Sequence, residues 1–166
     1  MIKDSGNRRE FATGSVRDIQ EGKGRCDLMP LDVVAHLLCS DEIQYIEKFR
    51  QTGSTCFLYS ALRTFCDESD FTNLEVMVLE VSKHFEEGAK KYGENNWQKG
   101  IPLHSYFDSA IRHLLKYWNN EIDERHDRAF CWNLMCAIWT YENKPELDDF
   151  TRKESSDGKV CLQVCE

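Results

Sequence analysis

Residues 129–139 read AFCWNLMCAIW, and this stretch decides how the rest of the chain must pack. It belongs to a predicted helix from about Asp123 to Tyr141 and is apolar on every side except at Asn133. A helix that is apolar all round must be covered on all sides, so we expect it at the centre of a bundle or sealed in a subunit interface. The side-chain amide of Asn133 needs hydrogen-bond partners, because an unsatisfied buried amide costs about 1 to 3 kcal/mol.

Five more helical segments are predicted before this one. They cover residues 30–38, 41–50, 55–66, 73–92 and 102–118. In the last two segments the apolar residues recur at steps of three and four, which places them on one face. These stripes are Leu74, Val78, Val81, Phe85, Gly88 and Tyr92 in one helix, and Phe107, Ile111, Leu114 and Trp118 in the other. The pattern predicts an all-α bundle, in which Asp108 and Arg112 are spaced to form an ion pair.

The composition is that of one ordinary globular domain. A chain of 166 residues, with 41% hydrophobic and 30% charged residues, can bury a core without disulfides or metals to support it. We divide it into an irregular Gly- and Arg-rich arm over residues 1–29, a helical catalytic bundle over 30–142 and a polar tail over 143–166. The alternating KVCLQVC near the end of the tail predicts either a short strand or a disordered end.

Charge and hydropathy exclude several classes of partner. The net charge of -8 disfavours an extended nucleic-acid surface, because a phosphate polymer would be repelled. No apolar run approaches the roughly 20 residues that span a bilayer, and the N-terminus lacks a hydrophobic signal core. We therefore expect a cytoplasmic protein that binds neither nucleic-acid polymer nor membrane. Its cysteines are expected to be reduced, with Cys161 and Cys165 as a weak candidate pair of zinc ligands.

Acidic and histidine side chains gather on two of the predicted helices. One row flanks the apolar stripe of the fourth helix and consists of Glu80, His84, Glu87 and Lys91. The segment 123–127 reads DERHD, and the polar hairpin KKYGENNWQKG at 90–100 separates the two groups. Crowded carboxylates raise one another's pKa, and a bound divalent cation removes that penalty. This arrangement is typical of a site that holds metal ions against phosphates.

Three segments resemble the phage dATP/dGTP diphosphohydrolase family. They are HFEEGAKKYGENNWQKGIP (84–102), DSAIRHLLKYW (108–118) and DERHDRAFCWN (123–133), and FATGSVRDIQEGKGRCDLMP (11–30) is similar to the opening block of that family. The resemblance implies an all-α, MazG-like nucleotide pyrophosphohydrolase. Such enzymes convert a purine deoxynucleoside triphosphate to the monophosphate and pyrophosphate with Mg²⁺ or Mn²⁺, as homo-oligomers, here a dimer or tetramer. Some serve phages that replace adenine with 2-aminoadenine, where the released dGMP feeds a dedicated synthetase.

Hydrolysis between the α and β phosphates needs an in-line water and neutralisation of the phosphate charge. With the resemblance, we assign the metal ligands to four carboxylates: Glu80, Glu87, Glu124 and Asp127. Glu87 and Asp127 are the expected catalytic residues, and Glu86 and Asp123 are alternates. Members of the family carry ExxE on one helix and ExxD on another. Glu124-x-x-Asp127 fits the second motif, whereas the first is absent as such.

Ten residues are expected to bind the nucleotide. They are Lys23, Arg25, Lys90, Lys91, Asn96, Trp97, Lys99, Arg112, His126 and Asn133. The cations are expected on the phosphates, with Lys23 and Arg25 closing over the nucleotide from the same or a neighbouring subunit. Asn96 and Trp97 are expected to read and stack on the base, unless Trp97 fills the core. His126 and Asn133 are expected to hydrogen-bond the sugar or a phosphate, or to have a structural role.

Two other functions fit parts of the same pattern. The adjacent His126 and Asp127 are similar to the metal-binding pair of HD-type phosphohydrolases, which release intact tripolyphosphate, and His104, His113 and Asp108 are possible further ligands. A non-enzymatic acidic helical module is the other alternative, and it predicts no metal-dependent stabilisation by nucleotides. The identity of the released anion separates the two enzymatic functions.

Overall fold

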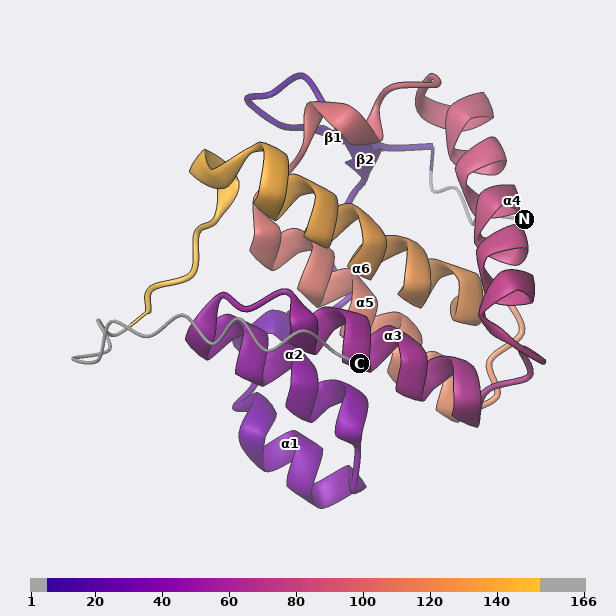
Figure 1. Cartoon of the computed structure of the whole chain (residues 1–166). Coiled ribbons are helices and arrows are strands. Elements are labelled where there is room, and N and C mark those ends of the chain that lie inside the picture. The colour runs from indigo at the N-terminus through magenta and orange to yellow at the C-terminus, as the bar shows by residue number, and fades with distance from the viewer. Residues whose placement is uncertain (1–5, 153–166) are drawn as a thin grey trace.

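The fold is a helical bundle with a small β-hairpin packed against it (Figure 1). The structure, a computed structural model, describes residues 6–152. In chain order the elements are β1 (Arg8–Glu10), β2 (Val16–Asp18), η1 (Cys26–Leu28), α1 (Leu31–Leu38), α2 (Asp41–Thr52), α3 (Cys56–Glu68), α4 (Leu74–Tyr92), η2 (Trp97–Lys99), α5 (Leu103–Trp118), α6 (His126–Asn143) and η3 (Pro145–Leu147). The all-α prediction is confirmed, because the strands in this range are a single three-residue pair.

Helix α6 lies at the centre of the bundle, as its apolar sequence predicts. Phe130, Cys131, Leu134 and Ala137 are fully buried, and α6 contacts α3, α4 and α5. The ring centroid of Phe130 lies 4.6 Å from that of Phe65 in α3. Figure 1 shows α4 crossing near the N-terminal end of α6, with α1, α2 and α3 gathered on another side.

The two amphipathic stripes are buried to different extents. In α5 every predicted stripe residue except Trp118 is buried. In α4 the prediction is partly wrong: Val81 is buried, but Leu74 and Val78 are 42% and 54% exposed, and Met77 enters the core instead. Helix α4 crosses α6 rather than lying alongside it (Figure 1). A crossing helix buries the part near the crossing point and not a whole stripe.

The sequence predicts the boundaries of α4 better than those of α6. Helix α4 ends as predicted, with the Asn73 side chain capping its start and Gly93 following its last residue. Helix α6 begins later than predicted, at His126, so Asp123 and Glu124 lie in the turn before it. The His126 ring hydrogen-bonds Asp123 with Nε2 and Oδ1 2.7 Å apart, which ties this turn to the helix.

The prediction of an irregular N-terminal arm is wrong for its first part, which forms a hairpin. Strands β1 and β2 pair antiparallel, with Arg9 opposite Arg17. At the turn, the backbone N–H of Phe11 donates to Ser15 O, and Gly14 adopts a φ of 76° that favours glycine. Strands of three residues are too short to show a period-two pattern in the sequence.

Asp108 anchors the arm to α5. Its Oδ1 accepts from the backbone N–H of Cys26 at 2.7 Å, and its Oδ2 accepts from Gln20 Nε2 at 2.8 Å. Arg112, one turn further along α5, pairs with the same carboxylate as predicted. Its Nε also donates to the carbonyl oxygen of Lys23 at 3.0 Å. One buried carboxylate therefore holds three parts of the chain together.

A second tie joins the arm to the segment that follows α4. The Asn96 side chain accepts from the backbone N–H of Val16 and donates to Val16 O, both at 2.8 Å. Ser15 Oγ donates to the carbonyl oxygen of Asn96 at 3.2 Å, and Thr13 Oγ1 donates to Gly100 O at 2.6 Å. The arm thus spans the space between η2 and α5 and forms a roof over it.

Two remaining sequence predictions concern cysteines and membranes. Cys131 and Cys136 are buried thiols as predicted, and the cysteines within residues 6–152 form no disulfides. The candidate zinc pair Cys161 and Cys165 and the predicted terminal strand lie outside the described residues. Among the described residues, no helix is both long enough and apolar enough to cross a membrane.

Replacing Asp108 with alanine is expected to loosen the arm and destabilise the fold. The substitution leaves the Arg112 guanidinium and the Cys26 N–H without their buried acceptor, which should cost about 3 kcal/mol of unfolding free energy. Urea unfolding measures the loss, and limited proteolysis within the arm measures its release. Asp67→Ala, at an exposed position on α3, is the matched control and should change stability by less than about 0.5 kcal/mol. Equal stability of the two variants would contradict the anchoring role.

Candidate functional site

A cavity of about 520 Å³ lies beneath the arm, between α4, α5 and α6. Small-molecule sites in proteins have volumes of about 300 to 1,000 Å³, so the space is sufficient for a nucleotide-sized ligand. Aromatic rings form part of the wall, namely those of Phe11, Phe85, Tyr92, Trp97 and Trp132. Cations line the side near the arm, and a histidine and carboxylates line the end near the start of α6.

Arg17 is a half-buried cation of the cavity wall. Its Nη2 donates to Asn133 Oδ1 at 2.9 Å. Its guanidinium carbon lies 5.4 Å from the ring centroid of Trp132 and 5.6 Å from that of Tyr106. Burial lowers the pKa of Arg17, and none of the carboxylates in residues 6–152 forms an ion pair with it. A partly desolvated cation that lacks a counter-ion favours the binding of an anion.

Three further cations of the cavity wall are held by neighbouring groups. Arg9 donates from Nη1 to Gln20 Oε1 at 2.7 Å and stacks over the Phe11 ring. Lys23 pairs with Asp18 at 2.8 Å. Lys116 of α5 pairs with two acids of the turn before α6. Acids that also line the cavity pair with Lys23, Arg112 and Lys116. Arg9 and Arg17 are therefore the cations of the lining that best suit a polyanionic ligand.

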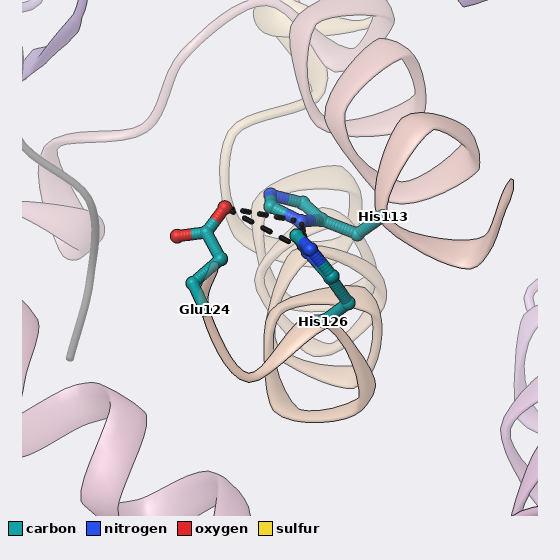
Figure 2. Close-up of side chains that lie close together, drawn as sticks. All are labelled: His113, Glu124 and His126. Carbon is teal, nitrogen blue, oxygen red and sulfur yellow. Dashed lines mark hydrogen bonds and ion pairs between the residues drawn. The ribbon is translucent and has the colours of Figure 1, made fainter. Parts of the chain in front are cut away.

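Two histidines and one glutamate converge at the other end of the cavity. His113 of α5 and His126 at the start of α6 approach each other with their Nδ1 atoms 2.9 Å apart. Glu124 Oε1 lies 3.5 Å from the first Nδ1 and 3.8 Å from the second (Figure 2). His113 and Glu124 line the cavity, as does Asp123, whereas His126 is buried behind them. We call His113, Glu124 and His126 the histidine–glutamate cluster.

Burial keeps two histidines of the cavity wall neutral. It lowers the pKa of His84 to about 4, and it lowers the pKa of His113 well below the ordinary value, with the neighbouring His126 as the next cause. A neutral imidazole has one nitrogen lone pair that can accept a proton or bind a metal ion. His84 also packs against the indole of Trp132, with ring centroids 5.6 Å apart.

Trp132 contributes a second unsatisfied group to the cavity. Its ring lines the wall, and its buried Nε1–H has no acceptor among residues 6–152. A buried donor without an acceptor costs about 1 to 3 kcal/mol unless a ligand or water satisfies it. The cavity therefore offers an incoming ligand an aromatic face and a cation, whereas the Nε1–H of Trp132 is itself covered.

The predicted cage of four carboxylates does not assemble. Glu80 accepts from Arg128 Nε at 2.8 Å and also pairs with Lys83, while Asp127 accepts from Arg125 Nε at 3.0 Å. Neither residue lines the cavity. Glu87 lies on α4 outside the lining as well, so only Glu124 of the four reaches it. Helical spacing could place these acids on a face, but it could not show that arginines would occupy the same face.

The ten predicted nucleotide-binding residues divide evenly. The cavity lining includes Lys23, Asn96, Trp97, Arg112 and Asn133, and it does not include Arg25, Lys90, Lys91, Lys99 or His126. Arg25 pairs with Asp27, and Lys90 pairs with Glu86 on the outer face of α4. Lys99 donates to the carbonyl oxygen of Gly14 at 3.0 Å. Asn96 is committed to the backbone of the arm, so its role is to hold the roof of the cavity.

The sequence prediction omitted several residues that the fold brings to the cavity, above all Arg9, Arg17, Trp132 and Lys116. His113 was considered only as a ligand for the alternative HD-type site. The buried amide of Asn133 was the available signal for Arg17, because an amide in an apolar helix requires a polar partner. Which arm residue supplies that partner depends on the hairpin, which the sequence pattern does not reveal. Arg9, Trp132 and Lys116 come from three different elements, which only the tertiary structure brings together.

Two groups of three potential metal ligands converge within residues 6–152, and both include His126. One is the histidine–glutamate cluster. The other combines His126 with Glu121 and Asp123. Lys116 already pairs with both of those acids, at 3.0 and 3.5 Å. The histidine–glutamate cluster is therefore the better fit for a divalent ion. The remaining HD-type candidates lie elsewhere, with His104 paired to Asp149 and Asp108 paired to Arg112.

Comparison with known proteins supports the family resemblance. The model of the family described as dATP/dGTP diphosphohydrolase, N-terminal, matches residues 73–150. This segment contains α4, α5 and α6, which form the cavity floor and carry the histidine–glutamate cluster. Over that segment the resemblance seen in the sequence is confirmed. No match to the chain was found among curated proteins or among solved structures.

The ion pairs of Glu80 predict a pH dependence of stability. Hydrogen bonds from Lys83 and then Arg128 lower the pKa of Glu80 to about 2. A carboxyl group whose pKa is lower in the folded state stabilises the fold above its ordinary pKa and loses that contribution as pH falls through the folded value. Glu80→Gln should therefore reduce the unfolding free energy by about 1 kcal/mol near neutral pH. The difference should shrink steadily as pH falls from about 5 toward 2.

Urea unfolding of both proteins over this pH range measures the effect. Glu86→Gln on the same helix removes a more exposed ion pair, the one with Lys90, and should have the smaller effect at every pH. A constant difference between wild type and Glu80→Gln across the range would show that the carboxylate charge is not the cause.

Proposed function

We propose that the chain hydrolyses a purine deoxynucleoside triphosphate, dATP or dGTP, to the monophosphate and pyrophosphate with a divalent cation. The family matched by α4, α5 and α6 supports a diphosphohydrolase. The observation that carries the finer proposal is the cavity itself, which is lined both by arginines of the arm and by members of a cluster of metal-ligating groups. A nucleoside triphosphate bound to a metal ion needs both.

The cationic side of the cavity suits the triphosphate chain. Arg17 has no carboxylate partner in the described chain, and its guanidinium is held by Asn133 and by the rings of Tyr106 and Trp132. A planar guanidinium that is held in place binds phosphate oxygens with paired hydrogen bonds. Arg9 and Lys23 add positive charge from the roof. Because these groups come from the arm, we propose that the arm contributes to substrate binding within its own chain.

The aromatic side of the cavity suits the base and sugar. Phe85, Trp97 and Trp132 pack against one another, with centroids 5.4 Å apart for the first pair and 5.8 Å for Phe85 with Trp132. An aromatic face stabilises a stacked base by about 1 to 3 kcal/mol. We therefore place the base against this aromatic wall and the phosphates toward the arm and the start of α6.

The reaction itself requires a water molecule, a base and charge neutralisation. The water oxygen bonds to the α phosphorus, and the bond from that phosphorus to the oxygen bridging the β phosphate breaks, so that pyrophosphate leaves. When bound, Mg²⁺ or Mn²⁺ neutralises phosphate charge and lowers the pKa of the water. Glu124, at the cavity wall, can accept the proton of the water or hold the ion. The positive groups of the arm can stabilise the negative charge of the leaving pyrophosphate.

Product analysis tests the proposed reaction. Incubation of the full chain with dATP, dGTP or dCTP and either Mg²⁺ or Mn²⁺ should release pyrophosphate and a monophosphate from the purine nucleotides, and much less from dCTP. Phosphorus NMR or ion-exchange chromatography identifies the anion. Tripolyphosphate as the product would instead favour an HD-type triphosphohydrolase, for which the close approach of His113 and His126 is the structural argument. No hydrolysis with either ion would overturn the proposal.

Arg17→Met is expected to lower kcat/KM for dGTP by about 100-fold, because a buried charge-assisted contact to phosphate is lost. Arg17→Lys keeps the charge but not the planar fork, so its loss should be smaller. Steady-state kinetics measure both, with circular dichroism to confirm the fold. Arg63→Met, at an exposed position on α3, is the matched control and should leave kcat/KM unchanged. Unaltered kinetics in Arg17→Met would remove this residue from the proposed phosphate site.

A further inference from the structure

We infer that His113, Glu124 and His126 form a binding site for a first-row transition-metal dication, such as Mn²⁺, Co²⁺ or Zn²⁺, in preference to Mg²⁺. The inference deepens the proposed function by naming the ion and its ligands. Any catalytic role of the ion rests on that function, whereas binding of the ion does not.

The spacing of the three ligating atoms matches the size of a metal coordination sphere. The two Nδ1 atoms are 2.9 Å apart, and Glu124 Oε1 is 3.5 and 3.8 Å from them. The point equidistant from the corners of a triangle with these sides lies about 2.0 Å from each. Bonds from transition-metal dications to histidine nitrogen and carboxylate oxygen are about 2.0 to 2.2 Å long. The distances between the three atoms therefore suit a single metal ion bound by all of them.

The ring of His126 is held in the orientation that metal binding needs. Its Nε2 lies 2.7 Å from Asp123 Oδ1, and because a carboxylate accepts, this nitrogen is the donor of the pair. Its Nδ1 faces His113 and Glu124 (Figure 2), and this is the atom that carries the lone pair in the tautomer protonated on Nε2. Metal-bound histidines generally donate their other N–H to such a partner, which fixes the ring and strengthens the ligand. The side chain is only 1% exposed, so it does not turn freely.

The chemistry of the ligands favours a transition metal. Two imidazole nitrogens and one carboxylate suit Mn²⁺, Co²⁺ and Zn²⁺, whereas Mg²⁺ prefers an octahedron of oxygen atoms and retains water. The four-carboxylate set that would have suited Mg²⁺ is divided by arginines, as described above. Three protein ligands also leave coordination positions open. His113 and Glu124 line the cavity, so those positions can accept water or phosphate oxygens.

Without an ion, the two Nδ1 atoms must share a proton in a hydrogen bond. A hydrogen-bonded pair of histidines is thus the structural alternative to a metal site. It predicts no selective ion binding and no spectroscopic change with Co²⁺. The two possibilities are distinguished by measurements that do not depend on nucleotide hydrolysis.

The experiment uses the full chain after treatment with EDTA. Dialysis against Mn²⁺, Co²⁺, Zn²⁺ or Mg²⁺, followed by elemental analysis, should show one tightly bound ion per chain for the first three. Mg²⁺ in 10-fold excess should not displace it. Bound Co²⁺ should show visible absorption bands altered by nitrogen ligands. His113→Gln and Glu124→Gln should weaken binding by at least about 10-fold, and Asp123→Asn, a positioning variant, by about 10- to 100-fold.

His36→Gln, on the exposed face of α1, is the matched control and should bind as wild type does. If His113→Gln fails to fold, the conservative Glu124→Gln and Asp123→Asn carry the test. Equal ion affinity in these variants and in wild type would overturn the inference, as would equal affinity for Mg²⁺. Metal binding without nucleotide hydrolysis would keep this site and reject the proposed function. Hydrolysis that Mg²⁺ supports and that the variants leave unchanged would keep the proposed function and reject this metal site.

Discussion

The buried carboxylate of Asp108 is the constraint on which the candidate site depends. It accepts hydrogen bonds from Cys26 N and Gln20 and pairs with Arg112, so it joins two points of the arm to α5. A buried carboxylate is stable only when such partners surround it. The same interaction closes the arm over the cavity and brings Arg17 to its wall. The buried carboxylate of Asp108 therefore determines which cations of the arm line the cavity.

Helix α6 joins the core to the site in a similar way. Its middle is apolar on all sides and is covered by the neighbouring helices, as an apolar helix requires. The polar residues that interrupt it, His126 at its start and Asn133 within it, both find partners at the cavity. Asn133 accepts from Arg17 and donates to the carbonyl oxygen of Ala129. Satisfying the amide therefore also positions the arginine that we propose for phosphate binding.

The charges near the start of α6 separate into two groups with different roles. Arg125 neutralises Asp127 two residues along the chain, and Arg128 pairs with Glu80 and so joins α6 to α4. Glu124, one residue before Arg125, turns instead toward the two histidines (Figure 2). Carboxylates that are close in sequence thus serve packing in one direction and the cavity in the other. Spacing along the chain could not separate them, because the partners come from other elements.

The sequence alone determined the helices, the central place of α6 and the Asp108–Arg112 pair. These depend on periodicity and on residues at most one or two helical turns apart, which local physics controls. It also indicated the family, through motifs that span α4 to α6. Only the tertiary structure decided which acids reach the cavity, that His113 meets His126, and that Arg17 covers Trp132. Those contacts join residues that lie far apart in the chain, and their geometry depends on how α4 crosses α6 and where the arm folds back.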